Sequence, residues 1–276
     1  LCTNPRHSWT NNETFASAVK KLELFVVQDI YDSIESAEEC TVFFPVVPGI
    51  KKEGTYINLE RRLSAMRPCL PRGEHEISDY EAILGVGRAL GMGDMLKGWE
   101  TPKEDERRLY EDGKFYTPSG KARFQFQSPV KNPLPLTEEF PYVFNTGRGS
   151  VGQWHTQSRT KEVQFVEDVS AAEAYLFMNP RTAECCRIQE NDWVRVYSVN
   201  GQNALFRVRV SDRVGEQELY APIHYIECNR LTPSVYDPYS KEPSYKATPV
   251  RFEKEHEKMA GKTDDEMGEE AGVCIG

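Results

Sequence analysis

Two runs of strand-forming residues, WVRVYSV and NALFRVRV within 193–210, constrain the fold more than any other part of the sequence. They flank Asn200-Gly201, a dipeptide that favours a type I′ turn, and so predict a β-hairpin. Asn179-Pro180 before RTAECCR is typical of a helix N-cap and the first helical residue. Several short strands with one short helix predict a small β-barrel, which we place at residues 141–253.

The first part of the chain alternates helices and strands instead. Residues 11–22 predict a helix that Asn11 or Asn12 can cap. The runs LELFVVQD (22–29) and CTVFFP (40–45) predict buried strands, and an entirely apolar strand is typical of a parallel sheet covered on both faces. This alternation predicts an α/β layer.

A capping box begins a further helix of this layer. Ser78-Asp-Tyr-Glu81 can satisfy the first backbone N–H groups, and Ile83, Val86 and Leu90 continue an amphipathic pattern. The strands are too few for a doubly wound sheet. We therefore expect the α/β layer to be truncated at the N-terminus of this chain.

These patterns divide the chain into four parts. We predict the end of an α/β domain at 1–104 and the barrel at 141–253. Between them, a charged stretch followed by recurrent prolines predicts a linker at 105–140. The acidic composition of residues 254–276 predicts a disordered tail.

The formal net charge of −9 argues against some functions. Residues 253–270 hold eight acids and three lysines, a charge of −5 that leaves −4 for the rest of the chain. The remaining negative charge argues against a nucleic-acid partner, because phosphate binding needs a basic face. No apolar run approaches the ~18 residues of a membrane span. The seven cysteines lack a C-x-x-C pair, which is typical of buried thiols in a cytoplasmic protein and predicts no metal site.

The stretch NTGRGSVGQWHTQSRT contains a G-x-G-x-x-G pattern at Gly147, Gly149 and Gly152, directly after an apolar run. A Rossmann turn would need a helix after the third glycine that packs on the sheet. The segment QWHTQSRTKE offers one large apolar residue, Trp154, with nothing apolar three or four positions later. The sequence therefore argues against a nicotinamide dinucleotide site.

The same stretch has the composition of an anion-binding loop. Arg148 can donate two hydrogen bonds to a phosphate, Trp154 can lie against a heterocycle, and glycines allow a ligand to approach the backbone. A solvated surface loop would explain the polarity but neither the tryptophan nor the glycines. A second polar cluster at 224–252 offers Asn229 and Lys246 as donors, although a turn or a cap explains each of them better when taken singly.

Taken in order, these segments resemble one family. TGR…QWHT, N-x-LT and DP-x-S-x-x-P-x-YK are similar to the C-terminal domain of molybdopterin oxidoreductases of the dimethyl sulfoxide reductase superfamily, most of all to bacterial assimilatory or periplasmic nitrate reductases. CTNP, VVQD, FFP-x-VPGIKKEGTYINLERR and GE-x-x-x-SDY resemble the end of the preceding domain. The resemblance covers nearly the whole chain apart from the linker and tail. It implies a Rossmann-like parallel sheet with helices, N-terminally truncated, followed by a six-stranded double-psi-type β-barrel.

The resemblance also implies a ligand. Enzymes of this family hold molybdenum in bis-molybdopterin guanine dinucleotide, and their last two domains contact that cofactor. An acid at Asp29 fits guanine, whose amine and ring N–H one carboxylate can accept together, whereas Asp79 is equally explained by the helix start. Matched motif by motif, the implied cofactor-binding residues are Asn4, Gln28, Asp29, Lys52, Asp79, Thr146, Gly147, Arg148, Gln153, Trp154, His155, Thr156, Asn229 and Lys246.

The family's iron–sulfur cysteines and its molybdenum ligand lie in earlier domains, and no motif here matches them. We therefore expect no catalytic and no metal-ligating residue in this segment, which would be inactive by itself, and a [4Fe-4S] cluster in the missing N-terminal portion. The resemblance implies three partners: that portion, an electron-transfer protein or subunit, and nitrate, which is reduced to nitrite by oxygen-atom transfer. Two alternatives stay open: a formate dehydrogenase of the same superfamily, and a non-catalytic module that binds the pterin dinucleotide.

Overall fold

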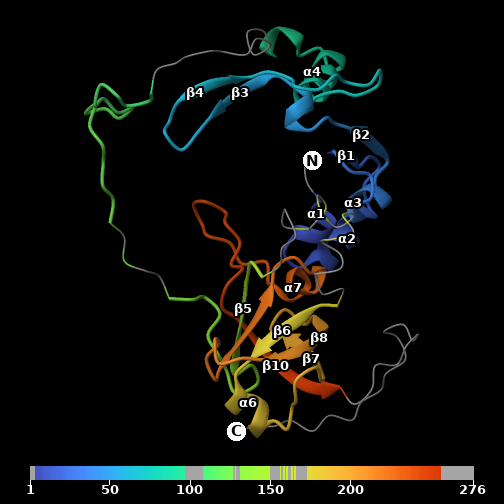
Figure 1. Ribbon diagram of the computed structural model, residues 1–276, viewed down its shortest axis with the longest axis vertical. Helices are drawn as coiled ribbons and strands as arrows, with labels where there is room; N and C mark the ends of the chain where they lie inside the picture. Colours follow the sequence, from blue (N-terminus) through green and yellow to red (C-terminus); the bar gives the residue numbers. More distant parts are fainter. Residues whose placement is uncertain are drawn as a thin grey trace. The chain divides into compact units, whose positions relative to one another are not determined.

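The computed structural model describes residues 4–96, 108–126, 128, 131–149, 156, 158, 160, 163, 165 and 173–255. These residues form two compact units, whose elements are labelled in Figure 1. The α/β unit comprises residues 24–32 and 40–131, and the barrel unit comprises residues 4–23, 33–39 and those from 132 onward. Two segments near the start of the chain therefore belong with the barrel.

The barrel unit is built on six strands that close in the order β10-β5-β9-β6-β8-β7. This closed barrel confirms the predicted β-barrel, and its six mixed strands are consistent with the double-psi type. The elements are β5 (Tyr142–Gly147), β6 (Tyr175–Met178), α6 (Pro180–Cys185), β7 (Trp193–Ser198), β8 (Asn203–Val210), β9 (Glu218–Pro222), α7 (Ile226–Leu231) and β10 (Thr248–Glu255).

The strand directions bring several strand ends together at one edge of the barrel. β5 pairs with β9 in parallel, and β10 runs antiparallel to β5 with Thr248 opposite Phe144. The ends of β5 and β9 and the start of β10 therefore lie together, at what we call the site edge. β6 runs antiparallel to β9, so α6, which follows β6, lies at the opposite edge (Figure 1).

Alternate residues of the strands fill the barrel interior, because the side-chain period of a strand is two. On β8, Ala204, Phe206 and Val208 are buried, whereas the residues between them are half-buried. Phe206 is fully buried, and its ring centroid lies 5.7 Å from that of Phe144 on β5. The strands thus form an apolar core across the barrel.

The helix α7 covers the site edge. Ser198 Oγ donates to Leu231 O at 2.7 Å, and Asn200 Nδ2 donates to Arg230 O at 3.0 Å. Two helices from the start of the chain, α1 (Pro5–Ser8) and α2 (Asn12–Val19), contact α7 in turn. Asn11 N, between these two helices, donates to the carbonyl of Asn229 at 2.9 Å. The N-terminal segment is therefore attached to the barrel at its site edge.

A third helix, α3 (Glu35–Glu38), is attached to α1 through Glu35. Asn4 Nδ2 donates to one Glu35 oxygen, and His7 Nδ1 lies 3.4 Å from the other. Burial alone would raise the pKa of the Glu35 carboxyl, but these hydrogen bonds outweigh burial and lower the pKa to about 2. The charged form of Glu35 therefore stabilises this part of the fold.

Replacing Glu35 with glutamine is expected to flatten the acid limb of the stability curve. Because the folded pKa of about 2 lies below the ordinary 4.5, the stabilisation is present above pH 4.5 and is lost as the pH falls toward 2. The effect is reduced by solvent screening, since the side chain is 38% exposed. Melting temperatures between pH 2 and 6 measure the effect. Glu38→Gln, an exposed acid of the same helix, is the control; equal acid slopes in wild type and Glu35→Gln would contradict the assignment.

The α/β unit contains one parallel strand pair, β1 (Val26–Asp29) with β2 (Val42–Pro45). It continues through η1 (Gly49–Lys51), the hairpin β3 (Gly54–Ile57) and β4 (Leu63–Met66), α4 (Asp79–Ala89) and η2 (Gly93–Leu96). The parallel pairing agrees with the predicted α/β layer. A larger Rossmann-like sheet stays a prediction, because β1 and β2 are the two members of this parallel sheet among the described residues.

The prediction that the apolar residues of the α/β unit are buried is wrong in two places. The capping box of α4 is confirmed, with both reciprocal bonds between Ser78 and Glu81. However, Ile83, Val86 and Leu90 are 53%, 47% and 70% exposed, so the described residues do not cover this apolar stripe. β2 is half-buried or exposed along its length, because a two-stranded sheet leaves it uncovered.

Two predicted details of helix and turn geometry also differ. Asn11 precedes α2 in a left-handed conformation and forms no side-chain cap, and α2 ends three residues earlier than predicted, at Val19. In the β7–β8 turn, Gly201 has a positive φ of 82° but Asn200 does not, so the turn is not type I′. Asn179 caps α6 as predicted. Within the described ranges, no helix is long and apolar enough to cross a membrane.

Candidate functional site

The site edge brings together the two polar clusters of the barrel sequence. Thr146 is buried at the end of β5, and its hydroxyl donates to Tyr245 O at 2.8 Å across 99 positions of the chain. Directly after β9, Ile223 N donates to Gly147 O at 2.8 Å. Three predicted residues, Thr146, Gly147 and Arg148, therefore lie beside the segment that carries Lys246.

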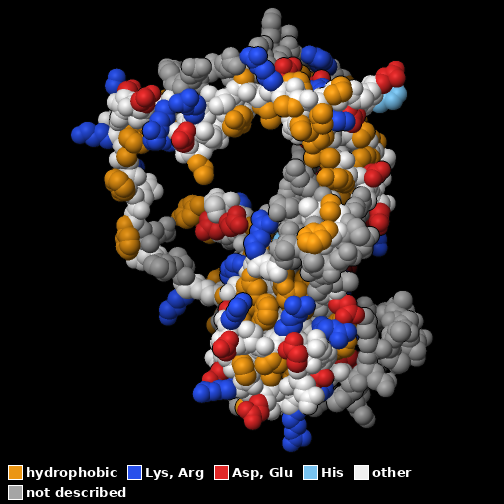
Figure 2. Space-filling view, in the orientation of Figure 1, with side chains coloured by type: hydrophobic (Ala, Val, Ile, Leu, Met, Phe, Trp, Pro, Cys, Tyr) orange, Lys and Arg blue, Asp and Glu red, His pale blue; other side chains and the backbone are white. Residues whose placement is uncertain are grey.

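Arg148 and Lys246 are cations of this edge, and both are exposed. Within the part of the chain that the structure describes, neither forms an ion pair with a carboxylate. Burial of part of its side chain lowers the pKa of the Lys246 ammonium, which indicates partial desolvation. Elsewhere on the face shown in Figure 2, the barrel unit carries basic and acidic side chains interspersed. Two cations without acidic partners are suited to an anionic ligand.

The two described glycines of the G-x-G pattern are required by packing within the barrel. A Cβ on Gly147 would lie 2.4 Å from the Tyr220 hydroxyl oxygen, and a Cβ on Gly149 would lie 2.8 Å from Pro222 Cγ. Both neighbours belong to β9. The sequence suggested that these glycines admit a ligand, whereas the structure shows that they admit the side chains of β9.

The rest of the predicted loop is described only in part. Gln153, Trp154 and His155 lie outside the described residues, so their predicted contacts with the cofactor stay predictions. Thr156 is described as a half-buried turn residue.

Asn4 and Asn229 are buried and have partners inside the barrel unit. Asn4 Oδ1 accepts from Ser36 N at 3.1 Å and from Ser36 Oγ at 2.8 Å. Asn229 Nδ2 donates to His7 O at 3.0 Å, while Asn229 Oδ1 is buried with no hydrogen-bond partner among the described residues. The sequence predicted Asn229 as a donor to the ligand. The structure uses one Nδ2 hydrogen for His7 and leaves Oδ1 as a further polar atom, so the predicted contact of Asn229 with the ligand stays a prediction.

In the α/β unit, three predicted residues bind one another. Asp79 accepts from Gln28 Nε2 at 3.1 Å and from Lys52 Nζ at 2.6 Å. Burial would raise the pKa of the Asp79 carboxyl, but the bonds from Lys52 and Gln28 outweigh burial and lower it. The sequence placed these residues at separate cofactor contacts, and the structure brings them together in one polar cluster.

Asp29 lies next to this cluster at the end of β1. Its Oδ1 accepts from Ile30 N at 2.7 Å and from Tyr31 N at 3.2 Å. Burial raises the pKa of the Asp29 carboxyl more than these bonds lower it, and the charge of Asp79 raises it further. Oδ2 takes no hydrogen bond from the described residues.

Sequence reasoning missed two tyrosines beside the site and one cavity. Tyr220 and Tyr175 donate to the carbonyls of Arg148 and Gly149, but a tyrosine in a strand carries no signal of such a contact.

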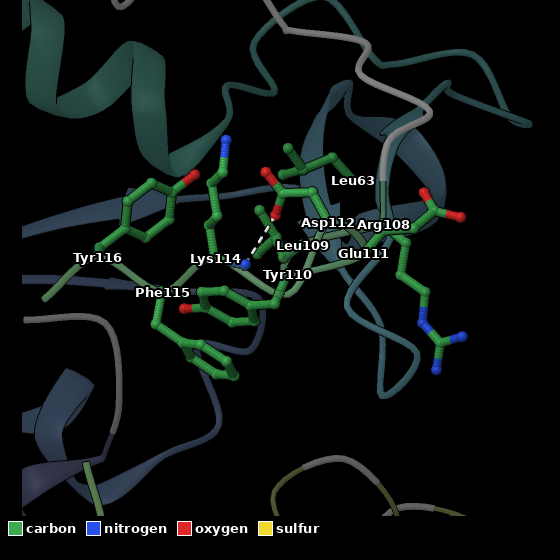
Figure 3. A pocket seen from close by; sticks show the side chains of 9 residues that line it. All are labelled: Leu63, Arg108, Leu109, Tyr110, Glu111, Asp112, Lys114, Phe115 and Tyr116. Carbon is green, nitrogen blue, oxygen red and sulfur yellow. Dashed lines mark hydrogen bonds between the residues drawn. The ribbon is translucent and has the colours of Figure 1, made fainter. Parts of the chain in front are cut away.

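The cavity, of about 630 Å³, lies in the α/β unit where the sequence predicted a linker (Figure 3). It is lined by Leu63, Arg108, Leu109, Tyr110, Glu111, Asp112, Lys114, Phe115 and Tyr116.

The cysteines and other metal-ligating residues form no candidate metal site within the described ranges. The prediction of buried thiols is wrong for most of the described cysteines. Cys228 is buried, whereas Cys69 and Cys185 are exposed, and Cys40 and Cys186 are half-buried.

The barrel matches a known domain family. Residues 142–249, from β5 into β10, match the family described as the molydopterin dinucleotide binding domain. The match includes Thr146, Arg148 and Lys246 of the site edge. The barrel is thus similar to molybdopterin dinucleotide-binding domains.

Formate dehydrogenases and nitrate reductases are similar to this chain over most of its length. The F420-dependent formate dehydrogenase subunit alpha of Methanocaldococcus jannaschii is 26% identical, covering 91% of this chain and 42% of that protein. The assimilatory nitrate reductase catalytic subunit of Bacillus subtilis is 25% identical, covering 91% and 41%. The acetylene hydratase from Pelobacter acetylenicus shares the fold, with a TM-score of 0.70 and 12% identity, covering 91% of this chain and 43% of that chain.

The chain therefore spans about two fifths of the length of these relatives. Its similarity to a formate dehydrogenase and to a nitrate reductase is nearly equal, so the predicted closer relation to nitrate reductases is not shown.

Proposed function

We propose that this chain is the C-terminal cofactor-binding portion of a molybdenum enzyme that uses bis-molybdopterin guanine dinucleotide. The observation that carries the proposal is the meeting of Thr146–Arg148 with the Tyr245-Lys246 segment at one edge of a dinucleotide-binding barrel. Arg148 and Lys246, which form no ion pair with the described carboxylates, suit the phosphates of such a cofactor. Asn229 Oδ1, which has no hydrogen-bond partner among the described residues, offers an acceptor in the same unit.

The chain's own residues would bind and orient the cofactor, which supplies two-electron redox chemistry when bound. In the barrel unit, Arg148 and Lys246 would neutralise phosphate charge. In the α/β unit, Asp29 Oδ2 would accept a hydrogen bond from the guanine base. The molybdenum ligand and the iron–sulfur cysteines are expected in another part of the enzyme, together with the contact to the electron-transfer partner.

Nitrate is the substrate that the sequence motifs favour, and its reduction to nitrite is the reaction we propose. Formate oxidation is the alternative, because a formate dehydrogenase is as similar to this chain as a nitrate reductase is. A module that binds the pterin dinucleotide without catalysis is the alternative from another class.

Isolation of the complete enzyme tests these proposals. We expect molybdenum and guanine nucleotide to co-purify with it, measured by elemental analysis and by chromatography of the released nucleotide. Nitrate reduction with a reduced viologen and formate oxidation with an oxidised viologen then separate the two substrates. An enzyme without bound guanine nucleotide would contradict cofactor binding. A loaded protein inactive in both assays would favour the non-catalytic module.

A further inference from the structure

Two tyrosines hold the backbone that leaves β5 at the site edge. Tyr220 Oη, on β9, donates to Arg148 O at 2.6 Å. Tyr175 Oη, on β6, donates to Gly149 O at 2.9 Å. Two consecutive carbonyls are thus held by hydroxyls from two paired strands.

The aromatic rings that carry these hydroxyls are fixed by their neighbours. The Arg209 guanidinium lies 4.0 Å from the centroid of the Tyr175 ring, and Tyr225 meets that ring edge-on at 5.7 Å. Phe177 lies 5.6 Å from the Tyr175 ring and 6.2 Å from the Tyr220 ring. Burial raises the pKa of both tyrosine hydroxyls, so both are protonated and can donate at neutral pH.

Holding a carbonyl also sets the direction of the N–H in the same peptide unit. In a trans peptide the two groups point in opposite directions. With Arg148 O bound to Tyr220, the Gly149 N–H points away from that tyrosine, and it donates no hydrogen bond to the described residues. A backbone N–H free to donate beside an arginine is a donor set for a phosphate oxygen.

The geometry points to Tyr220 and Tyr175 as positioning residues for the bound dinucleotide: Tyr220 orients the Arg148–Gly149 peptide toward a phosphate, and Tyr175 fixes the Gly149 carbonyl that follows it. This inference rests on the proposed cofactor binding by the barrel. The tyrosines act through the backbone and do not touch the ligand. Gly147 and Gly149 permit the arrangement, because a Cβ at either position would collide with Tyr220 or Pro222.

Tyr220→Phe and Tyr175→Phe test, without any ligand, whether the two hydroxyls restrain the backbone at Arg148 and Gly149. Each removes one hydroxyl and keeps the ring, so trypsin is expected to cleave the Arg148–Gly149 bond roughly fivefold faster under native conditions, as for the loss of one neutral hydrogen bond. Mass spectrometry of the fragments gives the rate. Tyr197→Phe is the matched control, because the Tyr197 hydroxyl donates to Glu253 at 3.3 Å instead. Unchanged cleavage in both variants, or equal acceleration at Arg181 on the opposite edge, would overturn the inference.

Titration with guanosine diphosphate tests whether the two tyrosine hydroxyls increase the affinity of the barrel for the ligand. We expect wild type and Tyr197→Phe to bind equally, and each of the other two variants to bind roughly fivefold more weakly. Equal affinity in all four proteins would overturn the positioning role. Absence of binding in wild type would contradict the proposed function itself, and with it the ligand part of this inference, whereas the trypsin result would still decide whether the hydroxyls hold the peptide.

Discussion

Replacing Phe206 with alanine is expected to lower the free energy of unfolding of the barrel unit by about 3–5 kcal/mol. Phe206 is fully buried among strands that close the barrel, and its ring packs against Phe144. Truncation removes the transfer free energy of the ring and leaves a cavity that a closed barrel cannot easily fill. Urea denaturation followed by circular dichroism measures the loss.

The neighbouring residue provides the control for this effect. Leu205 lies on the same strand and is half-buried because it points out of the barrel. Leu205→Ala is expected to cost about 1 kcal/mol or less, the usual range away from a core. Similar losses for Leu205→Ala and Phe206→Ala would contradict the assigned core face of β8.

Replacing Arg148 with alanine is expected to weaken guanosine diphosphate binding by roughly 10- to 150-fold, the equivalent of the 1.5–3 kcal/mol typical of a charge-assisted hydrogen bond. Lys246→Ala is expected to have an effect of the same kind, because its segment meets Thr146 at the same edge. In the complete enzyme, both changes should lower the molybdenum content per chain. Calorimetry and elemental analysis measure the two effects.

Arg181→Ala is the matched control for charge. Arg181 is 79% exposed on α6, at the opposite edge of the barrel, and pairs with Glu216. Its removal should leave ligand affinity and molybdenum content unchanged. Normal molybdenum content in both Arg148→Ala and Lys246→Ala would count against a phosphate site at this edge.

The sequence predicted those parts of the fold that depend on neighbouring residues. The β7–β8 hairpin, the Asn179 cap and the Ser78–Glu81 capping box each follow from a few adjacent side chains, and all three are present. The prediction of a type I′ turn was wrong because four residues, 199–202, lie between the two strands instead of two. A dipeptide preference does not determine loop length.

Long-range arrangements could not be predicted in the same way. Nothing in residues 4–23 indicates that they attach to α7 more than 200 positions later, because the contacts, such as Asn11 N to Asn229 O and Asn229 Nδ2 to His7 O, leave no pattern in the sequence. The motifs predicted cofactor contacts for Gln28, Lys52 and Asp79 one by one. That these three side chains bind one another depends on the parallel pairing of β1 with β2 and on the start of α4, which only the folded chain provides.

The closure of the barrel has a consequence for the order of events during synthesis. β5 pairs with β10, whose last residue is 255, and β10 also pairs with β7, so before β10 is made both β5 and β7 have an open edge. Pairings between distant segments form slowly, and open strand edges attract other chains. Because Tyr245 reaches Thr146 just before β10 begins, the site edge is completed only when the barrel closes. A chain that has not yet been synthesised through β10 therefore lacks the finished site edge.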